Sequence, residues 1–160
     1  DVIEKADLLI NKIKDEILLT KERLKKEELK KILCIEWLDP LMVAGNWIPD
    51  LLSFSKSQSI IGESGKHSSF IKLEDINEKD FDCIIIMPCG YDINKTKSEL
   101  KKFDYLFMKK FKNKKKFIVD GNRYFNRPST SLLESIKIFC EIIHPNIFLP
   151  YPSYQRWIEI

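Results

Sequence analysis

The run Asp82–Met87 constrains the fold of this chain more than any other segment, because three consecutive isoleucines lie within it. A strand that is apolar at every position must be covered on both faces, which is typical of the centre of a parallel sheet. Lys31–Trp37 and Lys116–Asp120 also predict strands, and segments with helical spacing lie between them. This alternation predicts an α/β fold, a three-layer Rossmann-like lobe with a mostly parallel sheet and right-handed crossovers.

Two long segments have the spacing of amphipathic helices. Residues 1–30 predict one helix that would be about 40 Å long at a rise of about 1.5 Å per residue. Its apolar face consists of Val2, Ala6, Leu9, Ile13, Ile17 and Leu24. A second helix is predicted over Ser131–Ile143, and the pair His144-Pro145 ends it.

The other segments predict shorter elements. Pro40 stops the first strand, and Gly45–Phe54 predicts a short helix after it. Ser59–Gly62 is expected to form a brief strand, and Leu73–Asn77 a helical turn. Residues 149–160 hold prolines and aromatic residues without a clear period, so we expect an irregular tail there.

Length and composition are those of one globular domain. The chain has 160 residues, 44% of them hydrophobic and 32% charged, which is enough for a hydrophobic core. No apolar stretch approaches the roughly 18 to 20 residues of a membrane span. The chain begins with Asp1 and passes directly into a helical pattern, so we expect no signal peptide here and expect these residues to be part of a longer product.

Positive charge is concentrated in one segment. Ten lysines and two acidic residues lie between Lys95 and Lys116, which gives this segment a net charge of +8 and leaves −5 for the rest of a chain whose total is +3. A nucleic-acid surface would use such a stretch to bind phosphates. However, an apolar stripe, Leu100, Phe103, Phe107 and Phe111, runs through it at helical spacing. The segment therefore predicts an amphipathic helix with a solvated lysine face.

The four cysteines predict no disulfide framework or zinc site, because no pair has the spacing of zinc ligands. Cys34, Cys83 and Cys140 lie within apolar runs and are expected to be small buried side chains. Cys89 follows a predicted strand, and we expect its thiol to line a pocket.

Four short phrases lie where strands are expected to end in loops, at Glu36–Pro40, Gly65–Phe70, Met87–Tyr91 and Asp120–Arg127. In an open α/β sheet, loops at the carboxyl ends of the strands converge on one crevice, and ligands bind there. Candidate apolar walls for a bulky ligand are Trp37, Trp47, Phe70, Tyr91, Tyr124 and Phe125. Candidate polar groups that would orient it are Glu36, Asn122, Asn126 and Arg127.

Reaction motifs are weak by comparison. Gly62–Ser68 suggests a phosphate-binding loop, but Ile60 and His67 occupy positions that require Gly and Ser or Thr. His67 is expected to form hydrogen bonds in its loop, with ligation of a metal held within a ligand as the alternative. A crevice enzyme, a hydrolase or a corrinoid-processing protein, would use Cys89, His67 and Glu36.

Several phrases, taken together and in order, resemble the C-terminal half of the cobalamin-binding-type substrate-binding proteins of ABC transporters. They are Glu36–Met42, Gly45–Leu51, Gly62–Ser68, Ile86–Tyr91 and Val119–Pro128. The combination is fairly specific to that family, whereas no single phrase is.

The resemblance extends over residues 1–148 and implies two α/β lobes joined by one long, rather rigid helix, with the ligand between them. Residues 1–30 would form the interlobe helix and residues 31–148 the C-terminal lobe, and the N-terminal lobe would be absent from this chain. The ligand implied is cobalamin, haem or an iron-siderophore. The partner implied is an ABC permease, the location is periplasmic or extracellular, and neither an intrinsic cofactor nor an enzymatic activity is expected.

The resemblance implies that the residues matching the family's phrases face the ligand. They are Trp37, His67, Phe70, Cys89, Tyr91, Asn122, Tyr124 and Phe125. Three alternatives remain open at this point. They are the crevice enzyme, a cytoplasmic corrinoid-binding protein, and an interaction domain that dimerises through its long helix.

Overall fold

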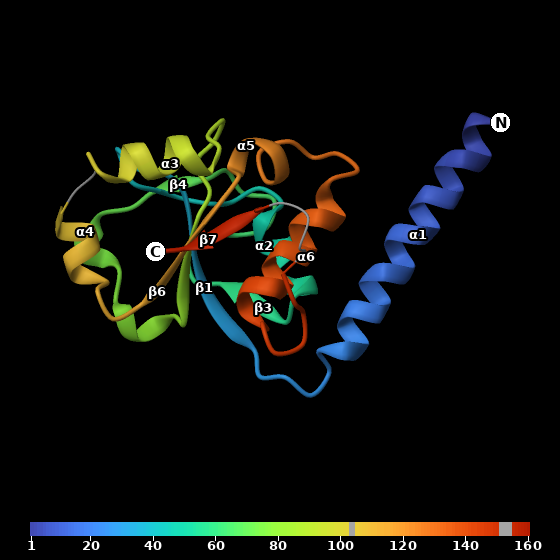
Figure 1. Cartoon of the computed structure of the whole chain (residues 1–160), viewed down its shortest axis with the longest axis horizontal. Helices are drawn as coiled ribbons and strands as arrows, with labels where there is room; N and C mark the ends of the chain where they lie inside the picture. The colour runs from blue at the N-terminus through green and yellow to red at the C-terminus, as the bar shows by residue number, and fades with distance from the viewer. Residues whose placement is uncertain (103–104, 151–154) are drawn as a thin grey trace.

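A seven-stranded sheet runs through the centre of the structure, between two layers of helices (Figure 1). The computed structural model describes residues 1–102, 105–150 and 155–160. The strands are β1 (Lys30–Trp37), β2 (Met42–Val43), β3 (Ser57–Ser59), β4 (Ser69–Phe70), β5 (Cys83–Ile86), β6 (Lys115–Val119) and β7 (Trp157–Glu159). Their order is β4-β2-β1-β5-β6-β7, and β3 pairs with the first residues of β1.

The centre of the sheet is parallel and its edges are antiparallel. β3, β1, β5 and β6 run in the same direction, whereas β2, β4 and β7 run against their neighbours. The prediction of a mostly parallel sheet is therefore confirmed for the central strands. Ile84, Ile85 and Ile86 are each 0% exposed, which confirms that this run is covered on both faces.

Helices cover the two faces of the sheet. They are α2 (Ile48–Phe54), α3 (Ile93–Leu100), α4 (Tyr105–Lys110), α5 (Gly121–Tyr124) and α6 (Leu132–Ile143), with short 3-10 turns η1 (Leu73–Asp75) and η2 (Glu78–Asp80); a further helix, α1 (Val2–Arg23), precedes the sheet. Ile85 packs with residues of α2 and α6, while Ile84 and Ile86 pack with residues of α3 and α4. Successive residues of a strand point to opposite faces, so one apolar run fills both cores of the three-layer lobe.

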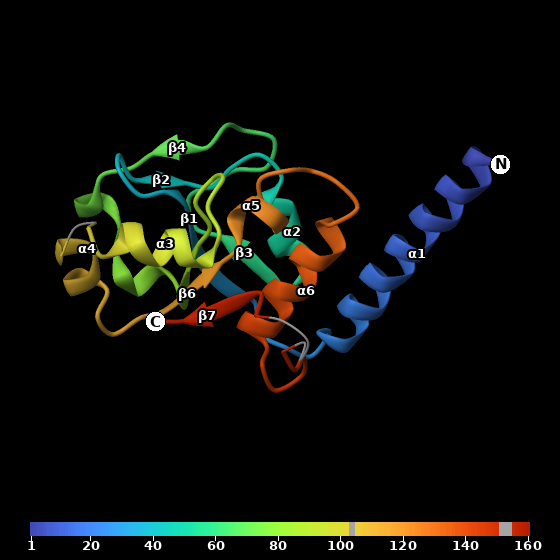
Figure 2. The same cartoon turned by 45° about the horizontal axis from the view of Figure 1, so that its top comes forward.

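The long helix α1 projects from the lobe (Figures 1 and 2), and its contacts with the described part of the lobe come from its C-terminal half. Ile17 packs against the core on the α6 face, and Leu24, which caps the helix, is 1% exposed. The guanidinium of Arg23 donates to the carbonyl oxygen of Ile147 over 2.5 Å and lies 4.0 Å from the ring centroid of Phe148. These contacts fix one end of α1 to the lobe.

Several apolar residues of α1 are exposed, both in its N-terminal half and beside its contacts with the lobe. The exposed apolar residues are Val2, Ile3, Leu8, Leu9, Ile10, Leu18 and Leu19. Single exposed apolar residues are ordinary in a folded protein. A helix that exposes as many apolar residues as α1 does offers a surface that another domain can cover. None of the helices in the described residues is both long enough and apolar enough to cross a bilayer.

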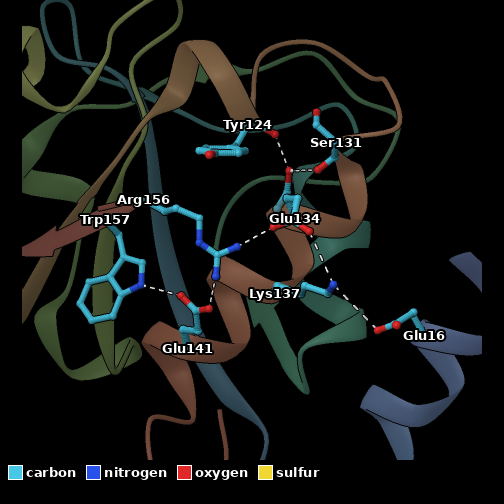
Figure 3. Close-up of polar contacts among 9 residues, drawn as sticks. Glu16, Tyr124, Ser131, Glu134, Lys137, Glu141, Arg156 and Trp157 are labelled. Atoms are coloured by element: carbon cyan, nitrogen blue, oxygen red, sulfur yellow. Dashed lines mark hydrogen bonds and ion pairs between the residues drawn. The ribbon is translucent and has the colours of Figure 1, made fainter. Parts of the chain in front are cut away.

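A chain of charged side chains connects α1 to the last strand (Figure 3). Lys137 on α6 lies 4.0 Å from Glu16 of α1 and 3.5 Å from Glu134 of its own helix. Glu134 also accepts from the guanidinium of Arg156, which directly precedes β7. The C-terminal segment therefore contacts the same face of α6 that faces α1.

Several predicted boundaries are wrong. The first helix ends at Arg23 rather than at residue 30, because the chain turns at Leu24 to bury that side chain in the core. The brief strand lies at Ser57–Ser59 rather than at Ser59–Gly62, since it pairs with the first residues of β1. The lysine-rich segment forms two helices, α3 and α4, instead of one, and Phe103 lies outside the described residues.

The tail is not irregular throughout. Residues 151–154 lie outside the described residues, but Trp157–Glu159 forms β7, antiparallel to β6. Its side chains join both cores, because Trp157 packs against the cluster on the α6 side and Ile158 against the other one. Three residues are too short for a pattern of alternation, so only the neighbouring strand shows that this segment pairs.

Candidate functional site

The loops after β1, β5 and β6 meet at one edge of the sheet. The backbone N–H of Cys89 donates to the carbonyl oxygen of Glu36 over 3.1 Å, which joins the first two loops. The N–H of Asn122 donates to the carbonyl oxygen of Tyr91 over 3.1 Å, which joins the second and the third. We call this surface, with the neighbouring loops at residues 44–47 and 62–68, the loop face. The predicted convergence is therefore confirmed for the three phrases that follow β1, β5 and β6, whereas Gly65–Phe70 was wrongly placed at a strand end, since it leads into β4.

Glu36 ties the first loop to the Gly62–Ser68 segment. The hydroxyl of Ser68 donates to the Glu36 carboxylate over 2.5 Å, and it accepts from the backbone N–H of Gly45 over 3.1 Å. The side-chain amide of Asn46 lies 3.3 Å from the same hydroxyl. The Glu36 side chain is half-buried, and the neutral hydroxyl of Ser68 fixes its carboxylate in place. A carboxylate held in this way is suited to orienting a ligand group or the loop itself.

Gly45 is needed for this packing. A Cβ atom at this position would lie 2.5 Å from the backbone oxygen of Lys66, a distance that side chains essentially never adopt. The next residue, Asn46, has a φ of 53°, in the left-handed region that asparagine tolerates better than most residues. Asn46 and Ser68 were not predicted as site residues, although the Gly-Asn pair is a signal for such a turn.

An aromatic pair forms the most evident apolar part of the loop face. The ring centroids of Trp37 and Tyr91 are 5.3 Å apart and tilted by 52°. Both residues are half-buried, and the indole N–H of Trp37 donates to the backbone oxygen of Asp39 over 2.9 Å. Each ring thus keeps part of its surface available for contact with a ligand.

Two other predicted residues are exposed near the same edge. His67 is exposed on the loop that precedes β4, and the side chain of Phe70 on β4 is 67% exposed. β4 lies at the end of the sheet order, next to β2, so Phe70 belongs to the margin of the loop face and not to its centre.

Tyr124 and Phe125 were predicted as apolar walls of the site, but the structure buries both side chains, and Phe125 reaches the loop face only as one of the residues that line a small cavity. They are only 4% and 1% exposed, and both belong to the core on the α6 side. The hydroxyl of Ser135 on α6 donates to the backbone oxygen of Tyr124, and the ring of Phe125 lies 5.1 Å from that of Phe139. Their apolar surface stabilises the lobe under the loop face, because the short helix α5 turns these side chains inward.

The remaining predicted residues divide into structural and exposed groups. The indole N–H of Trp47 donates to the backbone oxygen of Phe125 over 3.1 Å, and the amide of Asn126 donates to that of Pro88 over 3.2 Å. Both side chains thus hold loops together. Asn122 and Arg127 are exposed and available to a ligand.

The loop face is a wall and not an enclosed pocket. It contains a cavity of about 30 Å³, lined by Glu36, Asn46, Trp47, Ile48, Cys89, Phe125 and Asn126. That volume is on the order of one water molecule. Sites for bulky small molecules are usually about 300 to 1,000 Å³ in size. A ligand bound here needs a second surface to enclose it.

The thiols differ in what chemistry they can support. Burial raises the pKa of Cys83 and of Cys140 to about 12, and it raises the pKa of Cys34 well above its ordinary value. These three cysteines therefore remain protonated and inert, as expected for buried thiols. Cys89 is exposed, and no histidine lines the small cavity beside it in the described part of the chain.

The described residues contain no group of three or more histidine, cysteine or acidic side chains placed to hold a metal ion. His144, the second histidine, is buried far from the loop face in the fold, where its Nε2 lies 2.9 Å from the backbone oxygen of Ser55 near the end of α2. The loop face is thus suited to contact a ligand through rings and a few polar groups.

Comparison with known proteins identifies the fold. No protein-family model matches this chain, and no curated protein matches it in sequence. Among solved structures, an ABC transporter substrate-binding protein from Listeria monocytogenes EGD-e is similar, with a TM-score of 0.72 and 19% identity over 90% of this chain and 58% of that one.

Two further solved structures have names that state a ligand. A periplasmic heme binding protein from Pseudomonas aeruginosa has a TM-score of 0.58 at 11% identity, with 89% of this chain and 52% of that one covered. A periplasmic vitamin B12 binding protein from Vibrio cholerae has a TM-score of 0.54 at 10% identity, with 79% and 49% covered. This chain spans about half the length of these proteins and has the fold of that half.

Proposed function

We propose that this chain is one lobe of a two-lobed substrate-binding protein that delivers a metal-containing ligand to an ABC permease. The loop face is then one wall of the ligand site, and a second lobe supplies the other wall. The ligand belongs to the class of cobalamin, haem and iron-siderophores, which are large and carry extended apolar or aromatic surfaces. The lobe captures the ligand and performs no reaction on it.

One observation carries this proposal, namely that the loop face presents a half-buried aromatic pair beside exposed polar groups, with a cavity of only about 30 Å³ among its loops. Trp37 and Tyr91 offer ring surface, while Asn122 and Arg127 offer hydrogen-bond donors at the same edge. Aromatic surface with a few polar groups is the usual composition of a small-molecule site. The small size of this cavity agrees with a ligand that is enclosed between two surfaces.

The long helix supports the same arrangement. α1 is fixed to the lobe at one end, and its exposed apolar residues continue away from it. In the proposed protein α1 joins the two lobes, and the second lobe covers this apolar surface. Cleft closure would then be a small rotation of the lobes about α1. We place the protein outside the cytoplasmic membrane, where the proteins of similar fold named above as periplasmic also act.

The test is a binding titration of the longest natural protein that contains these residues. Cyanocobalamin, haemin and a ferric hydroxamate siderophore are titrated separately while tryptophan fluorescence and the ligand's absorbance are recorded. We expect saturable one-to-one binding of one of these three probes and weak binding of the same probe by the 160-residue chain alone. Equal affinity of both proteins, or no saturable binding of any probe, would overturn the proposal.

A further inference from the structure

The tip of the lobe that is formed by the end of α3 and by α4 has an unusual surface. Figures 1 and 2 place α4 at the end of the lobe away from α1. Tyr105 and Leu106, at the start of α4, are 73% and 57% exposed. Lys101 directly follows α3, and Lys109 lies one turn along α4 from both exposed apolar residues. We call these four residues, with Lys112, the tip patch.

We propose that the tip patch docks on a membrane surface that contains anionic lipids. This inference goes beyond the proposed function and does not depend on it.

The positive charges of the tip patch are not neutralised by acidic partners in the described residues, although the Nζ atom of Lys109 lies 5.7 Å from the ring centroid of Tyr105. Elsewhere in the segment, Lys95 and Lys102 pair with Glu99, and Lys110 and Lys114 donate to backbone oxygens. In contrast, no ion pair within the described residues involves Lys101, Lys109 or Lys112, and all three are exposed. Their charge therefore faces solvent and attracts an anionic surface within a Debye length, about 10 Å at moderate salt.

The apolar part of the tip patch borders a groove, which Leu106 lines. An open groove of about 650 Å³ runs between η1 and α4 and is lined by Leu73, Glu74, Leu106, Lys109 and Lys110. The Nζ atom of Lys110 donates to the backbone oxygen of Leu73 over 2.5 Å, which holds α4 against η1. Leu106 thus projects from a fixed support. Exposed apolar and tyrosine side chains surrounded by lysines are typical of segments that lie in the headgroup region of a bilayer.

The same features argue against a nucleic acid as the partner. The segment from Lys95 to Lys116 contains ten lysines and no arginine, although arginine is the residue that favours bidentate contacts with phosphate and bases. Phe107 and Phe111 are 0% exposed, so they cannot stack on bases. Lysine point charges around exposed apolar side chains fit a diffuse anionic surface better than a base-stacking site.

The experiment measures binding of the 160-residue chain to vesicles by co-sedimentation. Vesicles of phosphatidylcholine alone are compared with vesicles of phosphatidylcholine and phosphatidylglycerol, at low and high salt. We expect binding only to the second kind and a loss of binding at high salt. Binding that is equal for both kinds of vesicle, or that is unaffected by salt, would overturn the proposal.

Two pairs of variants locate the surface. The triple change Lys101→Glu, Lys109→Glu and Lys112→Glu should weaken partitioning at least about tenfold, because each lysine near an anionic surface contributes measurably. The matched control reverses three exposed lysines of α1, Lys5→Glu, Lys12→Glu and Lys14→Glu. It should leave partitioning nearly unchanged. If the control variant loses binding and the tip variant retains it, α1 binds the vesicles and the proposal is wrong.

The second pair tests the apolar contribution. Tyr105→Ser combined with Leu106→Ser should weaken partitioning severalfold, whereas Leu149→Ser, a change at a residue that is 80% exposed outside the tip patch, should not. All these positions are exposed, so circular dichroism is expected to show folded proteins. A labelled DNA duplex serves as the competing anion, and lysine-dependent binding to DNA without binding to vesicles would also overturn the proposal.

Discussion

The guanidinium of Arg156 lies 2.6 Å from the carboxylate of Glu134 and also contacts Glu141, so a cation from the C-terminal segment sits between two acidic side chains of α6 (Figure 3). Arg156 is 4% exposed and Glu141 5% exposed. The indole N–H of Trp157 donates to the second oxygen of Glu141 over 2.9 Å. This interaction fastens the last strand to the helix that also contacts α1.

Replacement of Arg156 with Met should destabilise the lobe strongly. The change leaves the buried carboxylate of Glu141 without its cation, and the loss of one partner of a buried ion pair typically costs about 3 to 5 kcal/mol. The measurement is the free energy of unfolding in urea.

The control is Lys25→Met, because Lys25 and its partner Glu22 are both more than two-thirds exposed. It should change the free energy of unfolding by less than about 1 kcal/mol. Adding Glu141→Gln to Arg156→Met should restore part of the loss. Equal stability of the Arg156 and Lys25 variants would show that the ion pair is not important.

Trp37 and Tyr124 should respond to truncation in opposite ways. In the proposed two-lobed protein, Trp37→Ala should weaken ligand binding by about tenfold or more, because the ring surface lies on the loop face. It should cost only ~1 kcal/mol of stability, since Trp37 is half-buried. Tyr124→Ala should instead cost about 3 to 5 kcal/mol of stability, because the ring is in the core.

The two quantities are measured separately, binding by fluorescence titration and stability by urea unfolding. If Tyr124→Ala lowered affinity while stability was unchanged, Tyr124 would be a ligand contact despite its burial.

The thiols should react in two classes. Cys89 is exposed, whereas Cys34, Cys83 and Cys140 are buried with a raised pKa. A chromogenic disulfide reagent at neutral pH should therefore modify one thiol rapidly in the folded chain and the other three only in denaturant. Cys89→Ser should abolish the rapid phase, and the control Cys83→Ser should retain it. Two rapid phases would contradict the burial of the remaining cysteines.

Stability should fall in mild acid because of His144. Burial lowers the pKa of this side chain below its ordinary value of 6.5, although the hydrogen bond with Ser55 and the carboxylate of Glu27 act in the opposite direction. The unfolded chain therefore binds the proton more readily than the folded chain does. The contribution of neutral His144 is complete above pH 6.5 and is lost as the pH falls from there towards the lowered pKa.

Urea unfolding of the wild type and of His144→Gln, followed between about pH 7.5 and 5.5, measures this contribution. The wild type should lose more stability over this range than the variant. His67→Gln is the matched control, because it removes the other histidine at an exposed position. Identical slopes for the wild type and His144→Gln would contradict the prediction.

The centre of the fold was predictable from local pattern. The run Ile84–Ile86 has no polar position, so it had to be covered on both faces, and the structure places it between two helical layers. The convergence of the loops after β1, β5 and β6 followed from the direction of parallel strands. The ends of α1 and the split of the lysine-rich segment did not follow, because apolar spacing continues across both points.

The composition of the candidate site was less predictable than its position. Trp37 and Tyr91 form a ring pair on the loop face, as aromatic residues after strands suggested. Tyr124 and Phe125 lie equally close to a strand end in sequence, yet α5 turns them into the core. Asn46 and Ser68 complete the contacts of Glu36 from loops that only the tertiary structure brings together.

The sequence by itself thus determined the α/β alternation, the doubly covered central strand and the edge at which loops gather, because these depend on periodicity and strand direction. The tertiary structure alone decided which aromatic rings face outward, how β7 pairs with β6, and how Arg156 comes to lie between Glu134 and Glu141. Each of these depends on contacts between residues far apart in the chain, which local pattern does not specify.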